Sequence, residues 1–196
     1  MTISKGAAWG VPAPLPPGGA VVATDAAAAA LVGSDQPVGL VGGDLCRTLG
    51  GHGSAERLAS AEAVTFPVDA ISVSLDGAPA LNAVAHVVAR TRGWRRAFMA
   101  MNAQWLGEWN VAPRGHPDDG RLETLEWSLS WRAARQVLAR MRLGSHLPHP
   151  GIATMTTAST TVAFDRPRWV WVDGVRVGRA RALTVVVAPD ALRVVV

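Results

Sequence analysis

From residue 153 to its C-terminus the chain is an almost unbroken series of strand patterns, and this feature limits its fold most. After a first strand-like stretch at 153–164, four more segments follow, at 168–174, 175–180, 182–187 and 191–196. Val, Thr and Trp favour extended backbone, and the turn residues Asp173-Gly174 and Pro189-Asp190 separate the segments. Many short strands joined by tight turns predict an antiparallel β-sandwich.

The same period-two pattern extends upstream and is interrupted by one helix. Residues 63–77 alternate from Val68 on, while 95–105 read as a strand and 80–93 as either a strand or a helix. The helix is predicted over 130–144, with one face formed by Trp131, Ala134, Leu138 and Met141. The predicted fold class is therefore mostly β (α+β), with a sandwich domain over 63–196.

The first part of the chain has a different character. Prolines at 12, 14, 16 and 17 predict an extended arm over residues 1–19. Residues 20–62 then alternate short apolar strands with short helices, the first of which Asp25 could cap. This order is typical of a parallel α/β layer, but two strands are too few for an independent nucleotide-binding domain.

Composition excludes several classes of protein. With 49% hydrophobic and 17% charged residues, the chain is not intrinsically disordered. No apolar run reaches the roughly 18 to 20 residues that a helical membrane span needs, and no secretory signal is evident, so a cytoplasmic location is expected. Cys46 is the only cysteine, which excludes an internal disulfide and predicts a small buried residue. The net charge of +4 mildly favours anionic partners.

Five segments occur in the order seen in bacterial diacylglycerol and sphingosine kinase-like lipid kinases, members of the NAD kinase-like superfamily. Residues 102–123 are similar to the family's NGxYYGGG, AP and DGxLD stretch, and 144–152 to its GxHxxxPxV motif. The other three resemble its VDGE hairpin, its closing P.AL.V strand and its PLGTGNDFARxLG loop, at 168–178, 185–196 and 38–51. The chain thus resembles a shortened, degenerate member of this family, which implies the family's β-rich second domain preceded by an α/β remnant at 20–62.

The departures from the family pattern affect the nucleotide site. In the phosphate-loop remnant, Gly42 and Asp44 match, but Gly43 replaces asparagine and Val41 replaces threonine. No GGDGT-like loop, whose amides would cradle phosphate, lies upstream of Val38. The resemblance therefore implies that no nucleotide cofactor is held.

The resemblance also implies where a ligand or metal would bind. A ligand cleft is expected near Asn102, Trp109 and Asp173, and Asp173 would be the catalytic base only if the chain is active, since Val175 replaces the glutamate of VDGE. Asp119 and Leu122 fall where the family has a magnesium-binding loop, so Mg²⁺ is the one metal expected, with a polar β-turn as the alternative.

Three functions follow as expectations. The leading one is a non-catalytic lipid kinase homologue that binds a lipid or another anionic small molecule, or regulates a protein partner. The alternatives are a lipid kinase completed by a partner chain, and a structural or nucleic-acid-binding subunit, although nucleic acid is the least expected partner. Trp169 and Trp171 share one strand face and are expected in the core, but would suit a peripheral membrane contact if exposed near arginines. Residues 192–196 are expected to form an exposed edge that could pair in a homodimer.

Overall fold

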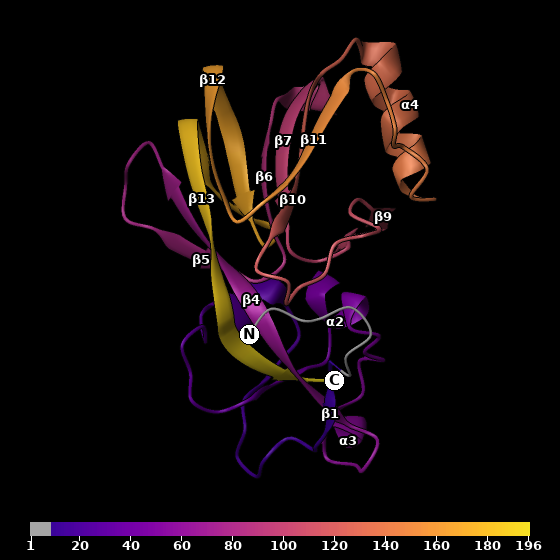
Figure 1. Ribbon diagram of the computed structural model, residues 1–196, viewed down its shortest axis with the longest axis vertical. Coiled ribbons are helices and arrows are strands. Elements are labelled where there is room, and N and C mark those ends of the chain that lie inside the picture. Colours follow the sequence, from indigo (N-terminus) through magenta and orange to yellow (C-terminus); the bar gives the residue numbers. More distant parts are fainter. Residues whose placement is uncertain (1–8) are drawn as a thin grey trace.

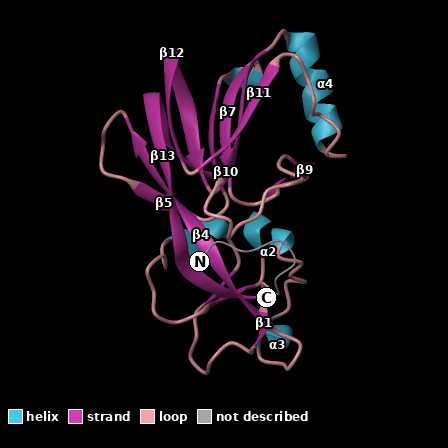
Figure 2. Cartoon of the chain, viewed as in Figure 1, coloured by secondary structure: helices cyan, strands magenta, loops and turns pink. Residues whose placement is uncertain are grey.

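The computed structural model describes residues 9–196 as a long twisted sheet with a few small helices at its periphery (Figure 1, Figure 2). The strands are β1 (Val11–Pro12), β2 (Val21–Val22), β3 (Val38–Leu40), β4 (Val64–Leu75), β5 (Leu81–Ala83), β6 (His86–Arg90), β7 (Arg96–Met101), β8 (Trp105–Leu106), β9 (Trp109–Asn110), β10 (Leu122–Ser128), β11 (Ile152–Thr157), β12 (Ser159–Val172) and β13 (Val175–Val195). The helices are α1 (Asp25–Ala29), α2 (Asp44–Thr48), α3 (Ala55–Leu58), the 3₁₀ turn η1 (Arg92–Trp94) and α4 (Trp131–Met141). The predicted mostly β fold, with a large antiparallel sheet, is confirmed.

One sheet contains almost all of these strands. Its order is β1-β4-β13-β12-β6-β7-β10-β11, with β5 beside β4 and β3 beside β13. The long strands β4 and β13 run from the upper part of Figure 1 into its lower part, next to the small helices α2 and α3. The segment predicted as 80–93 is two strands rather than a helix, because β5 pairs with β4 while β6 lies between β12 and β7.

The α/β segment joins the same sheet through its C-terminal strand. β2 and β3 are parallel, as predicted, and β3 pairs in parallel with the end of β13 at Val194↔Val38. On its other side the end of β13 pairs with β4. The prediction that 192–196 forms an exposed edge is therefore wrong, since this stretch is an interior strand with Val194 and Val195 fully buried.

Within residues 9–196, three large apolar cores and a small one of Leu58, Ala63 and Val195 hold the structure together, because burying apolar surface is the main driving force for folding. One contains Ile71, Val87, Phe98 and Leu183 from the sandwich strands. A second packs α1 and α2 onto β3 and the end of β13, and includes Cys46, which is buried as predicted. The third lies under α4.

Helix α4 begins where the sequence predicted, and of the predicted apolar face it buries Ala134 and Met141 fully and Leu138 partly. Ser130 caps it by accepting a hydrogen bond from the Ala133 amide at 3.3 Å. The buried face is Ala134, Val137 and Met141, whereas Trp131 is 54% exposed. Trp131 departs from the prediction because its ring lies against the backbone of Gly93, at the edge of the core.

Two further predictions concern the N-terminal arm and the absence of a helix that could span a membrane. The first eight residues of the predicted arm lie outside the described residues, and the rest of the arm runs along the sheet, with β1 pairing with β4 and the Trp9 ring 4.6 Å from that of Phe66. Within residues 9–196, no helix combines the length and apolar character needed to cross a bilayer.

Candidate functional site

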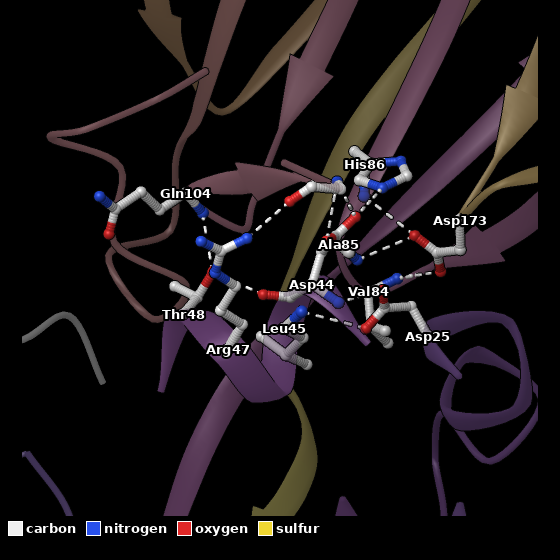
Figure 3. Close-up of polar contacts among 11 residues, drawn as sticks. Asp25, Asp44, Leu45, Arg47, Thr48, Val84, Ala85, His86, Gln104 and Asp173 are labelled. Carbon is white, nitrogen blue, oxygen red and sulfur yellow. Dashed lines mark hydrogen bonds and ion pairs between the residues drawn. The ribbon is translucent and has the colours of Figure 1, made fainter. Parts of the chain in front are cut away.

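A buried polar network lies where the α/β segment meets the sandwich (Figure 3). The turn between β12 and β13 places Asp173 there, with a positive φ of 46°. Its carboxylate accepts hydrogen bonds from the amides of Val84, Ala85 and His86, at 2.8, 3.0 and 2.9 Å. Burial raises the pKa of Asp173, against the opposing effects of His86 and these amides. Asp173 therefore fixes the start of β6 against the β12–β13 turn.

His86 connects this turn to helix α2. Its Nε2 lies 2.9 Å from Oδ2 of Asp44, and both Asp44 oxygens accept a hydrogen bond from the Gly107 amide, at 2.9 and 3.0 Å. Burial opposes charge on both residues, but it is outweighed: the contact with His86 and the Gly107 amide lowers the pKa of Asp44, and the contact with Asp44 raises the pKa of His86. The contact between the two side chains therefore favours the charged form of each.

Asp25 occupies the amides that a phosphate would need. Its Oδ2 accepts from the Asp44 amide at 2.7 Å and its Oδ1 from the Leu45 amide at 3.0 Å, so it caps α2. The predicted role of Asp25 as cap of its own helix is wrong, because Thr24 caps α1. Free amides at the start of a helix are what a phosphate-binding loop offers to an anion. Here a carboxylate of the same chain takes the place of the anion.

The two glycines of the phosphate-loop remnant serve this internal contact. A Cβ on Gly43, whose φ is +97°, would lie 2.4 Å from Oδ1 of Asp25. A Cβ on Gly42 would lie 2.6 Å from the carbonyl oxygen of Ala23. Both glycines therefore let the strand-to-helix segment at 23–25 pack directly against the loop.

The network also offers a set of atoms with metal-ligand chemistry. Within residues 9–196, one group of His, Cys, Asp or Glu residues could hold an ion, namely Asp25, Asp44 and His86, whose ligand atoms lie within 4.8 Å of one another. Mg²⁺ usually keeps several of its waters. That preference fits this group poorly, because Asp25 and His86 are buried and the His86–Asp44 contact occupies the space between them.

A pocket of about 230 Å³ adjoins the network and contains one of the predicted cleft residues. It is lined by His86, Val88, Arg90, Trp94, Leu106, Gly107, Trp109, Trp171 and Gly174. Three tryptophans belong to its wall, and the Trp94 ring meets the Trp109 ring edge-on at 5.0 Å. The Arg90 guanidinium lies between two of these rings, 4.6 Å from the centre of Trp94 and 4.2 Å from that of Trp171.

The other predicted cleft residues lie outside this pocket. Asn102 is buried, and its Nδ2 donates to the carbonyl oxygens of Asp69 and Val84, both at 2.9 Å. Asp173 lines a second, more open pocket of about 400 Å³, together with Ala26, Leu81 and Val175. Only the neighbouring Gly174 reaches the aromatic pocket.

The turn predicted to bind Mg²⁺ surrounds a buried carboxylate. Asp69 accepts from the Gly120 amide at 2.7 Å and from the Asp190 amide at 3.0 Å. Burial, with the charges of Asp69 and Asp190, raises the pKa of the nearby Asp118 to about 6. Asp119 lies in this turn and Leu122 follows it as the first residue of β10, so their assignment to Mg²⁺ stays a prediction.

Sequence reasoning missed four residues that organise the site. Asp25 and Asp69 were not singled out as partners of distant amides, and Arg90 and Trp94 were not assigned to a pocket. The sequence carried a signal only for Arg90 and Trp94. Arg90, Arg92 and Trp94 alternate along a short stretch next to an apolar strand, a spacing that places residues on one face of an extended strand. His86 is a buried histidine whose Nε2 contacts Asp44.

Comparison with known proteins agrees with this architecture. Residues 54–196 match the family described as the YegS C-terminal NAD kinase beta sandwich-like domain. Because the match covers most of the chain, the protein belongs to this family.

Solved structures extend the likeness to the fold. A structure described as a putative diacylglycerol kinase from Bacillus anthracis str. Sterne superposes with a TM-score of 0.60 at 12% identity, over 81% of this chain and 69% of that one. A second, described as a diacylglycerol kinase of the same organism, gives 0.55 at 13% identity, over 81% and 66%. Among the curated proteins compared, none matches. At such identities the likeness shows the fold alone.

Proposed function

We propose that this chain is a non-catalytic lipid kinase homologue that binds an anionic, amphipathic small molecule, such as an acidic lipid, in the aromatic pocket. The observation that carries the proposal is Arg90. Within residues 9–196 its guanidinium makes no ion pair or hydrogen bond, and it is held by the rings of Trp94 and Trp171. An arginine held in this way can offer its donors to an acidic group while the rings contact an apolar tail.

The surroundings of Arg90 favour a charged ligand over a neutral one. Burial lowers the pKa of its guanidinium, so the positive charge is already partly removed from water. A positive charge with fewer waters around it is stabilised more by an anion than a fully solvated charge would be. The indoles of Trp94, Trp109 and Trp171 give the same pocket its apolar wall.

Two features of the network support a non-catalytic role. A kinase needs a carboxylate that can orient or deprotonate the attacking hydroxyl. Asp173, the candidate base, is buried and already accepts three backbone hydrogen bonds. The helix amides that could hold a phosphate are bonded to Asp25. Both groups serve the fold itself.

Titration calorimetry with a short-chain, monomeric phosphatidic acid tests the proposal. Wild-type protein should bind it and should bind the matching phosphatidylcholine at least about tenfold more weakly. Replacing Arg90 with Gln should weaken binding of the acidic lipid by about 10- to 100-fold, because a charge-assisted contact is lost. Arg132→Gln, on the exposed side of α4, removes the same charge away from the pocket and should leave binding unchanged.

Two outcomes would contradict the proposal. Equal affinity for the acidic and the neutral lipid would show that Arg90 does not select the ligand. Binding of ATP–Mg²⁺ by the same protein would favour the alternative of a kinase, and radiolabelled phosphate transfer to diacylglycerol would then establish it.

A further inference from the structure

A tryptophan with two arginines forms an exposed patch beside the pocket. We call Trp169, Arg176 and Arg179 the Trp169 patch. Trp169 is 40% exposed, which overturns the expectation that it lies in the core. The guanidinium carbons of Arg176 and Arg179 lie over its ring, 4.7 and 5.4 Å from the centre. The three side chains therefore form a single surface feature with an apolar centre and positive flanks.

Strand pairing explains why these side chains meet. Trp169 of β12 is opposite Arg179 of β13, and Trp171 is opposite Arg176. Residues opposite each other in an antiparallel pair project from the same face of the sheet. Trp169 is also opposite Arg90 of β6, so the patch continues the face that lines the aromatic pocket.

The positive charge of the patch is not neutralised by the protein. Arg176 and Arg179 form no ion pair in the described part of the chain, and the one hydrogen bond of these two guanidinium groups runs from Arg179 to the carbonyl oxygen of Pro167 at 3.1 Å. The two carboxylates nearby in sequence are engaged elsewhere, since Asp165 pairs with Arg96 and Asp173 is buried among backbone amides. The patch is therefore complementary to a negatively charged surface.

We propose that the Trp169 patch docks the protein onto an anionic lipid bilayer. Indole rings prefer the boundary between lipid tails and water, and arginines beside them are attracted to acidic headgroups. Single-stranded nucleic acid would use the same charges, but it would stack its bases on an open ring face. Two guanidinium groups already lie over the Trp169 ring. The inference concerns a surface outside the pocket and does not depend on the pocket ligand.

Co-sedimentation with phosphatidylcholine vesicles, with and without phosphatidylglycerol, measures this docking. Wild-type protein should bind the acidic vesicles and not the neutral ones. The double variant Arg176→Gln/Arg179→Gln should partition about 30-fold more weakly, since each arginine near an anionic surface contributes about a factor of five. Trp169→Ala should also weaken binding, with the charge unchanged. Circular dichroism should show that the variants keep the wild-type fold and melting temperature.

The control is a second double variant of equal charge. Arg132→Gln/Arg135→Gln removes two exposed arginines from α4 and should lower vesicle binding less than about threefold, because charges beyond a Debye length are largely screened. Equal losses in the two double variants would overturn the proposal, because overall charge would then explain binding. It would also be overturned if the patch variants bound vesicles normally but lost affinity for a single-stranded oligonucleotide.

The proposal for the pocket and the proposal for the Trp169 patch can be contradicted independently of each other. The patch variants should still bind monomeric phosphatidic acid, and Arg90→Gln should still sediment with acidic vesicles. Loss of vesicle binding in Arg90→Gln alone, with the patch variants unaffected, would place membrane contact at the pocket and overturn the docking surface.

Discussion

Asp25 shows how one side chain can replace a ligand. Its carboxylate accepts the two amides at the start of α2, although it belongs to another helix. Burial, despite these hydrogen bonds, raises its pKa from 3.8 to about 6. The contact between Asp25 and the α2 amides therefore carries a free-energy cost, because the charged carboxylate is held away from water.

This cost predicts a specific dependence of stability on pH. Between the ordinary value of 3.8 and about 6, the folded protein holds a proton on Asp25 that the unfolded chain has released. Stability must therefore fall as pH rises through this window, and the cost is complete above it. Relative to Asp25→Asn, the wild-type free energy of unfolding should decrease by an amount on the order of 2 kcal/mol from about pH 4 to about pH 7. Urea titrations of both proteins measure this difference, which would stay constant if Asp25 were ionised throughout.

Gly43 gives a second prediction at the same scale. Gly43→Ala should destabilise the protein by about 2 to 3 kcal/mol, because the new Cβ meets the Asp25 carboxylate and the positive φ disfavours alanine. Gly18→Ala is a matched control, since Gly18 has a φ of +79° but no neighbouring atom within 4 Å of the place that its Cβ would take. It should cost about 1 kcal/mol, from the backbone conformation alone. If thermal melts showed the same loss of stability in the two variants, the contact between a Cβ at position 43 and Asp25 would not be the reason that Gly43 is needed.

At the scale of single elements, the stability of helix α4 depends on the cap at its first turn. Only one side of the helix packs against the sheet, and Trp131 lies outside the core. Ser130 accepts a hydrogen bond from one of the otherwise unpaired amides at the start of the helix. Ser130→Ala should lower the free energy of unfolding by about 1 kcal/mol, whereas Ser130→Asp should keep it near wild type because aspartate caps equally well. Denaturant unfolding of the three proteins tests this, and equal destabilisation by both substitutions would indicate that the cap is not the cause.

At the scale of the whole molecule, strand β13 joins the α/β segment and the sandwich into one unit. It pairs with β12 in the sandwich, with β4 along most of the length of β4, and with β3 at its C-terminal end, so neither the sandwich nor the α/β segment has a complete sheet without it. Unfolding should therefore be a single transition, with circular dichroism and tryptophan fluorescence giving the same midpoint. Two separated midpoints would show that the α/β segment and the sandwich unfold independently.

What could be predicted from the sequence was local. The alternation from Val68 on and the turn at Asp173-Gly174 gave strands and a turn where the structure has them, because side-chain period and turn residues act over a few positions. The pairing of Val38 with Val194, and the cap that Asp25 provides for α2, join residues far apart in the sequence. No local pattern signals such contacts. The aromatic pocket was missed for the same reason, since Arg90, Trp109 and Trp171 come from separate elements.

The length of β13 also bears on how the protein is made. The strand covers residues 175 to 195, and its neighbours β3, β4 and β12 all precede it in the chain. During translation these neighbours leave the ribosome before the strand that joins them exists. Their edges must then wait unpaired, and exposed edges are prone to wrong pairing. Folding in the cell therefore depends on keeping the partly synthesised chain from aggregating until β13 emerges.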